Sequence, residues 1–130
     1  MKRIGFLINP VAGMGGAVGL KGTDGKVEEA RRRGARPFAN NRARITLSQL
    51  AHDKSLEFVT CSGAMGEDPI RVTGIQKYQV LYYFKGESSA QDTRQAAQIF
   101  LKAGVDLILF CGGDGTARDI FDAVGRDVPI

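Results

Sequence analysis

The chain has 130 residues, a net charge of +4, 43% hydrophobic and 25% charged residues, which is typical of a globular domain with one core. Its 17 glycines are nearly double the usual share of about 7%. The chain has two cysteines, Cys61 and Cys111, which lie far apart in the sequence, and a single histidine. This composition argues against a disulfide framework and against a zinc site. It favours free thiols in a reducing compartment.

The first half of the chain is rich in glycine and arginine. Arg3–Ile8 is an apolar run ending at Asn9-Pro10, which predicts a buried strand leading into a loop. The break comes too early for a signal peptide or a membrane span, so we expect a cytoplasmic protein. Val11–Gly25 is too rich in glycine for regular structure. A short polar helix is expected at Lys26–Arg33, and apolar residues at helical spacing predict another within Phe38–His52.

The second half alternates apolar strands with helices. Gly63–Thr73 is ambiguous, with a short helix near Asp68-Pro69 as one interpretation. Val128–Ile130 resembles the opening of a further strand, so we expect a truncated protein. The remaining expected elements are strands at Leu56–Cys61, Tyr78–Phe84 and Val105–Cys111, a helix from Ser88 or Ser89 to about Ala103, and a helix at Thr116–Val124.

Near-continuous apolar strands that alternate with helices predict an α/β fold, a doubly wound, Rossmann-like parallel sheet with helices on both faces. The basic residues between Lys26 and Arg44 favour anionic partners. They lack the interleaved aromatic residues of a base-stacking platform, so we expect small-molecule nucleotides as partners and not nucleic acid. Whether the protein forms a homo-oligomer is left open.

The strongest functional signal is Gly112-Gly113-Asp114-Gly115-Thr116, directly between a predicted strand and a predicted helix. Ligands of open α/β sheets bind beyond the carboxyl ends of strands. Glycine N–H groups and a helix N-terminus can cradle phosphate, and Thr116 can cap the helix or donate to a phosphate oxygen. A carboxylate among these amides repels phosphate, so Asp114 is expected either to accept a proton from an attacking hydroxyl or to help hold magnesium.

The second signal is the loop Asn9-Pro10-Val11-Ala12-Gly13-Met14-Gly15-Gly16, which follows the first strand. Its polar member, Asn9, can donate to and accept from a ligand. The spacing excludes a Walker loop, because Leu20 precedes Lys21, and excludes a dinucleotide fingerprint, because Val18 stands where glycine or alanine is required. We expect this loop to bind ligand beside the first motif.

Three further residues carry weaker signals. Thr23 and Asp24 can position a polar group at the site, although a plain turn explains them equally well. His52 lies near the end of a predicted helix, where a capping or surface role is favoured. With one histidine and two distant cysteines, no zinc site is predicted.

The two motifs together resemble the superfamily of NAD kinases, diacylglycerol and sphingosine kinases and 6-phosphofructokinases. The chain is most similar to the ATP-NAD kinase-like proteins, through Ile8–Gly16 with Leu20–Gly25 and through Gly112–Asp119. This resemblance implies ATP or polyphosphate as phosphate donor, Mg²⁺, and transfer to the 2′-hydroxyl of NAD to give NADP.

The resemblance also implies roles for particular residues. Asp114 would be the general base or a contact to the substrate ribose. The phosphates would lie against Gly112, Gly113, Gly115 and Thr116, and the same cleft would be lined by Asn9, Pro10, Gly13, Gly15 and Gly16. Residues 1–130 would form the N-terminal nucleotide-binding domain of a two-domain kinase. Since the β-rich second domain of such kinases has no counterpart here, we expect the isolated chain to be inactive.

Two other functions remain open. Diacylglycerol-type lipid kinases share both motifs but usually continue with an Asn-Glu pair, whereas this chain has Ala117-Arg118-Asp119. That departure favours the NAD kinase-like branch. The other alternative is a non-catalytic nucleotide-binding module.

Overall fold

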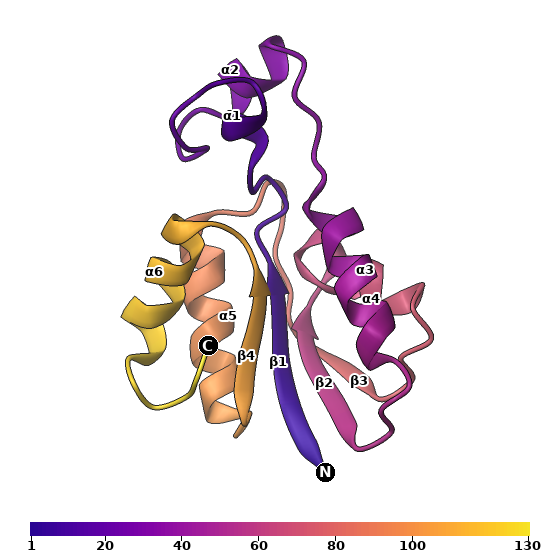
Figure 1. Ribbon diagram of the computed structural model, residues 1–130. Helices are drawn as coiled ribbons and strands as arrows, with labels where there is room; N and C mark the ends of the chain where they lie inside the picture. The colour runs from indigo at the N-terminus through magenta and orange to yellow at the C-terminus, as the bar shows by residue number, and fades with distance from the viewer.

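A computed structural model describes residues 1–130. Its centre is a four-stranded sheet in the order β3-β2-β1-β4, formed by β1 (Lys2–Ile8), β2 (Leu56–Cys61), β3 (Tyr78–Tyr82) and β4 (Leu107–Cys111). Every neighbouring pair of strands is parallel. The predicted α/β doubly wound sheet is therefore confirmed, and all four carboxyl ends of its strands lie at one edge (Figure 1).

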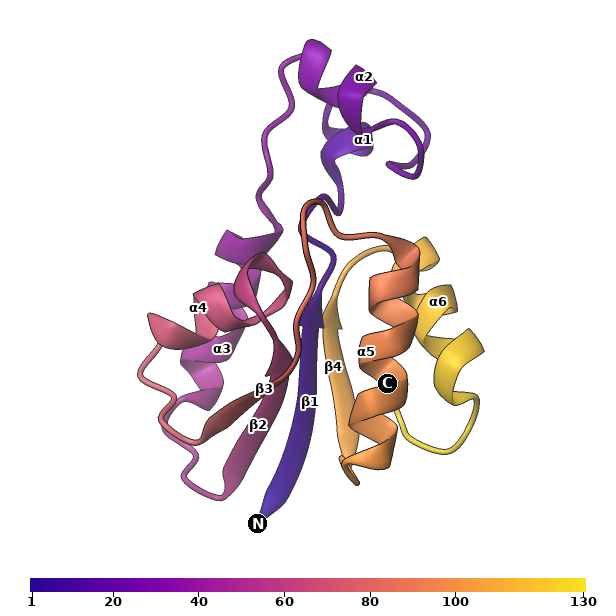
Figure 2. The same cartoon turned by 180° about the vertical axis from the view of Figure 1, so that it is seen from behind.

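Helices cover both faces of the sheet. One face carries α3 (Ala39–Leu50) and α4 (Glu67–Arg71), and the other carries α5 (Ala90–Lys102) and α6 (Asp114–Val124), as the two opposite views show (Figures 1 and 2). A single turn of 3₁₀ helix, η1 (Gly63–Met65), joins β2 to α4. The ambiguous segment after β2 thus forms η1 and α4. None of the helices has the length and apolar character needed to cross a membrane.

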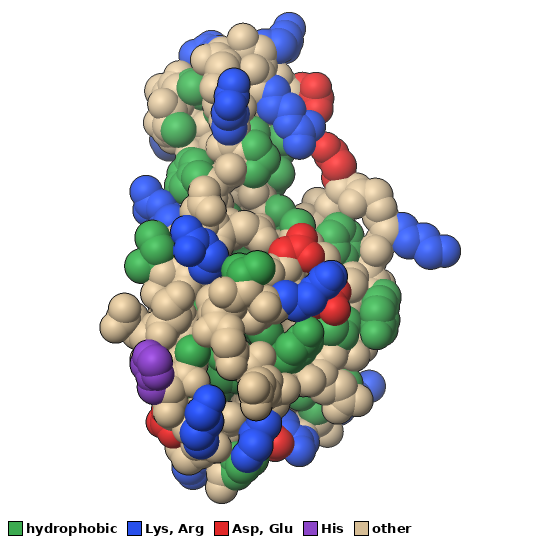
Figure 3. Space-filling model, turned by 90° about the vertical axis from the view of Figure 1, so that its right-hand side faces the viewer, with side chains coloured by type: hydrophobic (Ala, Val, Ile, Leu, Met, Phe, Trp, Pro, Cys, Tyr) green, Lys and Arg blue, Asp and Glu red, His purple; other side chains and the backbone are tan.

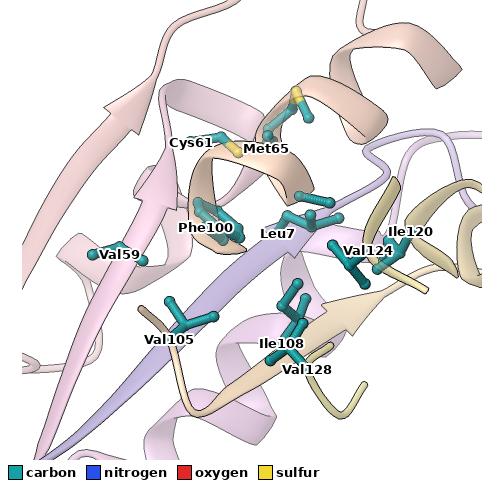
Figure 4. Close-up of a cluster of buried hydrophobic side chains, with 12 residues drawn as sticks. Leu7, Val59, Cys61, Met65, Phe100, Val105, Ile108, Ile120, Val124 and Val128 are labelled. Carbon is teal, nitrogen blue, oxygen red and sulfur yellow. The ribbon is translucent and has the colours of Figure 1, made fainter. Parts of the chain in front are cut away.

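Alternating residues of the central strand divide the core in two. Leu7 of β1 points to the α5 and α6 face, where it joins a buried cluster with Phe100, Ile108 and Ile120 (Figure 4). Ile4, Phe6 and Ile8 belong to the cluster on the α3 and α4 face. Because successive side chains of a strand point to opposite faces, the continuous apolar run of β1 fills both halves of the core.

The glycine-rich segment forms a small lobe, residues 10–38, that stands beyond the carboxyl ends of the strands (Figure 1). It contains α1 (Met14–Ala17) and α2 (Val27–Arg32), so the expectation of no regular structure in Val11–Gly25 was wrong for α1. Met14 and Ala30 are fully buried within the lobe. Burial of the Met14 side chain stabilises this helical turn, which its glycine content alone disfavours.

Several element boundaries differ from the predictions. Ser89 caps α5 in a reciprocal capping box with Asp92, as one of the two predicted caps. β3 ends at Tyr82 and not at Phe84, since the Phe84 N–H donates to Ser62 Oγ and not to a strand. Val128–Ile130 is not a strand, although the Ile108 N–H donates to the Pro129 carbonyl at 2.9 Å on the outer side of β4.

Candidate functional site

The two motifs follow neighbouring strands, β1 and β4, at the point where the strand order reverses. β2 and β3 lie on one side of β1, and β4 lies on the other. The Asn9 N–H donates to the Cys111 carbonyl at 2.9 Å, which joins the two strand ends directly. In open α/β sheets, ligands bind at this switch point.

Asn9 connects the first motif to the second. Its side-chain Nδ2 donates to Thr116 Oγ1 at 3.2 Å, and its Oδ1 accepts from the Val11 N–H at 3.2 Å. One side chain thus fixes the turn after β1 and the first turn of α6. The second hydrogen of the Asn9 amide has no protein acceptor, and Asn9 borders the groove between the two motifs.

Helix α6 begins earlier than predicted, at Asp114, with Gly113 as its N-cap and no side-chain cap. The proposed N-cap role of Thr116 was therefore wrong: Thr116 lies in the first turn and is buried. The first hydrogen bond of the helix runs from Ala117 N–H to the Gly113 carbonyl. The N–H groups of Asp114, Gly115 and Thr116 therefore have no partner within the helix, as is general for helix N-termini.

Two glycines of the second motif differ in what surrounds them. A Cβ on Gly112 would lie 2.5 Å from the side chain of Thr116, whereas a Cβ on Gly113 would meet nothing within 4 Å. Gly112 is thus required by packing against α6. Gly113 leaves the space in front of the helix N-terminus open.

The glycine loop of the lobe is held by its own contacts. The Gly15 N–H donates to Thr23 Oγ1 at 3.1 Å, and a Cβ on Gly15 would overlap the carbonyl oxygen of Gly22. Gly13 has a φ of 78° and lies against the ring of Phe38. Gly15 therefore shapes the loop from within, whereas Gly13 and Gly16 lie at the surface.

These loops enclose a groove of about 290 Å³ between the lobe and α6. Asp114 is exposed at its edge and takes part in no hydrogen bond or ion pair. The Asp24 carboxylate approaches from the lobe, with its Oδ2 3.0 Å from the position of a Cβ on Gly115. The groove is lined by most of the predicted site residues: Asn9, Gly13, Gly16, Thr23, Asp24, Gly113, Asp114, Gly115 and Thr116.

A model of the family described as ATP-NAD kinase N-terminal domain matches residues 4–130. The chain belongs to the ATP-NAD kinase family. Both motifs lie within the matched residues, and the suspected family and the N-terminal domain are thereby confirmed. None of the curated proteins or solved structures compared with the chain matches it significantly. Membership places the protein among kinase-type phosphotransferases that bind nucleotides.

In this ATP-NAD kinase domain, three predicted residues do not line the groove. Gly15 is buried under Gly22 and Gly112 packs on Thr116. Pro10 borders a second cavity beneath the lobe. His52 is exposed just after α3, at the edge of the sheet opposite the two motif loops (Figure 3). This position agrees with the surface role expected for it.

Sequence reasoning missed the loop after β3 in the ATP-NAD kinase domain. Ser88, Ser89 and Thr93 border a hollow that also touches Asn9 and Asp24. This loop leaves the carboxyl end of a parallel strand, so its position at the site follows from the same rule that located the two motifs. The sequence pattern predicts its serines only as helix caps.

Magnesium, which the ATP-NAD kinase family implies, can be tested against the carboxylates of the groove. No group of three His, Cys, Asp or Glu side chains is close enough to form a metal cage. Asp24 and Asp114 border the same groove. Mg²⁺ in kinases is commonly held by one or two carboxylates together with substrate phosphates and water, and this donor set fits that mode.

The thiol next to the ATP-NAD kinase motif is not suited to be a nucleophile. Cys111 ends β4, and its Sγ donates to the Ala39 carbonyl at 3.6 Å. Burial raises the pKa of Cys111 above its ordinary value, and the positive charge of Arg42 offsets only part of this. Since the thiolate is the reactive form, Cys111 is a packing residue of the strand end.

Proposed function

We propose that the protein transfers a phosphoryl group from ATP, or from polyphosphate, to the 2′-hydroxyl of the adenosine ribose of NAD, with Asp114 as general base. One observation carries this proposal: a free carboxylate stands at the edge of a groove whose floor is an uncapped helix N-terminus. Anions are stabilised at such a terminus. The carboxylate itself repels phosphate and is free to accept a proton from an alcohol.

The phosphates of the donor would lie between α6 and the lobe. Free N–H groups from Asp114 to Thr116 would donate to phosphate oxygens, and the remaining amide hydrogen of Asn9 would do so from the other strand end. Gly13 and Gly16 would form the opposite wall. Catalysis of phosphoryl transfer consists mainly of positioning and of neutralising charge on the transferring group, and these groups supply both.

The acidic side chains would have separate tasks. Asp24 would hold Mg²⁺ from the lobe, together with the phosphates, and Asp114 would take the proton of the attacking hydroxyl. Magnesium, when bound, neutralises the charge that develops on the transferring phosphoryl group. The two carboxylates reach the groove from different parts of the chain, so closure of the lobe would bring both tasks together.

We further propose that residues 1–130 act as the donor half of a two-domain enzyme in which a β-rich domain completes the NAD site. The groove offers phosphate-binding groups and a base but few groups that would recognise nicotinamide. The isolated chain is therefore expected to bind nucleotide and to turn it over slowly or not at all.

The general base is tested by Asp114→Asn in the full-length protein. The amide keeps the size of the side chain but cannot accept the proton, so NADP formation from ATP and NAD is expected to fall by roughly 100-fold or more. Asp122→Asn, an exposed site on the same helix, is the matched control and should retain full activity. Both variants should melt at the wild-type temperature.

Near-normal activity of Asp114→Asn would remove the base assignment. A wild-type protein that forms no NADP but phosphorylates a diacylglycerol would identify a lipid kinase. A protein that binds ATP and phosphorylates neither acceptor would be a nucleotide-binding module.

A further inference from the structure

The lobe leaves a second cavity beneath it, of about 480 Å³, on the side of α3 and α4. Its walls come from Val11, from Val27 and Arg31 of the lobe, and from Phe84 and Glu87 in the loop after β3. In Figure 3 the lobe projects from the body of the protein on this side, and the surface is hollowed beside the base of the lobe. The volume lies within the roughly 300–1,000 Å³ typical of small-molecule sites.

This cavity is continuous with the phosphate groove. A hollow of about 400 Å³ lies between them. It shares Asn9, Thr23 and Asp24 with the phosphate groove. It shares Val11, Val27 and Ser88 with the cavity beneath the lobe. An elongated ligand with phosphates at one end can therefore extend from α6 to Phe84 without leaving the protein surface.

The cavity has both an apolar wall and free polar groups. Phe84, Val11 and Val27 offer the apolar surface. Asn40 donates through Nδ2 to the Ala64 carbonyl at 3.0 Å, which leaves its Oδ1 without a protein donor. Asp68 is exposed and takes part in no hydrogen bond. Two free acceptors and an aromatic ring that border one cavity match the exocyclic amino group and the flat face of adenine.

An ion pair joins two walls of the cavity. Arg31 Nη1 of α2 lies 2.9 Å from Glu87 Oε1 of the loop after β3. This is the one side-chain hydrogen bond between residues 13–36 and the rest of the protein. A ligand beneath the lobe would thus be enclosed between the lobe and this loop.

We infer that the cavity beneath the lobe binds the adenine of a nucleotide whose phosphates lie against the N-terminus of α6. This inference rests on the proposed function, because it requires phosphates in the groove beside Asp114. The proposed function places the phosphates of the donor at α6, so the expected occupant is ATP. NAD carries the same adenine, and an NAD occupant would assign the phosphates at α6 to the acceptor instead. The ring of Phe84 is the stacking surface, and Asp68 with Asn40 accepts from the amino group.

The test compares Phe84→Leu with the wild type in the full-length protein by calorimetric titration of ATP, NAD and inorganic tripolyphosphate. Leucine keeps an apolar contact with the core that Phe84 touches but removes the aromatic face. Loss of one stacking contact is expected to weaken binding of the adenine-containing occupant by roughly tenfold. Tripolyphosphate, which has no base, should bind with unchanged affinity. Tyr83→Leu, an exposed neighbour that does not border the cavity, should change nothing.

The outcomes separate the two proposals. A selective loss for ATP supports the inference and assigns the cavity to the donor, and a selective loss for NAD supports it and assigns the cavity to the acceptor. Unchanged affinities for both nucleotides in Phe84→Leu and in Asp68→Asn would overturn the inference and leave the phosphate site standing. A wild-type protein that binds none of the three ligands would overturn both proposals.

Discussion

At the scale of single residues, the glycines of the two motifs have different physical reasons for being glycine. Gly15 and Gly112 have no room for a Cβ, because backbone or a side chain occupies that place. Gly16 and Gly113 face open space, so a side chain there would reach into the groove and meet the ligand. The first pair determines the shape of the loops, and the second keeps the phosphate position clear.

This difference predicts unequal effects of two adjacent substitutions. Gly15→Ala must displace the carbonyl of Gly22, so we expect the lobe to lose about 1–3 kcal/mol of local stability. Gly16→Ala is the matched control, because its Cβ meets nothing within 4 Å and alanine favours the helical backbone of α1. Native-state hydrogen exchange of the lobe amides measures the effect: faster exchange in Gly15→Ala alone is expected, and equal exchange in both variants would contradict it.

The motifs located the correct loops but not the role of each residue in them. Asn9 and Thr116 are 107 residues apart, and no local pattern indicates that they share a hydrogen bond. The sequence predicts Thr116 as a cap because threonine is a favoured N-cap residue, yet the chain becomes helical two residues earlier. Gly15 was counted with the ligand-facing glycines although its N–H is already bonded to Thr23. Such roles depend on long-range packing, which spacing along the chain does not contain.

At the scale of elements, the lobe is a nearly separate unit. α1 and α2 contact each other, and no backbone hydrogen bond joins residues 13–36 to the sheet or its helices. Pro10 and Pro37 lie in its two connections to the body, where a fixed φ limits the directions of movement. The lobe carries the glycine loop and Asp24, so its position determines the width of the phosphate groove.

The ion pair between Arg31 and Glu87 is expected to hold the lobe against the loop after β3, as in this structure. Arg31→Ala should therefore increase cleavage by chymotrypsin after Phe38 by up to roughly fivefold, because an exposed pair contributes little. Arg32→Ala is the matched control, since Arg32 pairs only with Glu29 of its own helix. Digestion followed by mass spectrometry gives the rates. Equal rates in the two variants would show that the pair does not restrain the lobe.

Elements with a regular hydrophobic pattern were predictable, and those without one were not. β1, with its apolar run around Leu7, and α5, with its Ser89 cap, are where the pattern placed them. α1 was missed because four residues are too few for periodicity, and two of them are glycine. Met14 of α1 is fully buried, which only the folded chain reveals.

At the scale of the whole molecule, the sheet order creates the site. A parallel sheet was predictable from the alternation of strands and helices, but the order β3-β2-β1-β4 depends on pairing between distant strands. This order places β1 beside β4, so that the two glycine motifs meet. Had β4 been added beside β3, the motifs would lie at opposite ends of the sheet. The site is thus a consequence of topology as much as of the motifs themselves.

The same sheet buries a thiol that reports on global unfolding. Cys61 is fully buried at the end of β2 in the cluster on the α5 and α6 face. Burial, with the nearby charge of Asp92, raises its pKa to about 12. At pH 8 the thiolate is therefore scarce in the folded protein, and we expect iodoacetamide to modify Cys61 only when the core opens.

Mass spectrometry of the labelled peptides, with and without urea, measures this directly. Cys61 should react at least about a hundredfold more slowly in the folded protein than in urea, whereas the half-buried Cys111 should be protected less.

Because the pKa of Cys61 in the folded protein lies above its ordinary value of 9.0, the unfolded chain releases the proton of this thiol at a lower pH than the folded protein does. Stability should thus be independent of this group below about pH 8 and fall as the pH rises toward 12. Rapid labelling of Cys61 in the native protein would show that the core between the sheet and α5 is not closed.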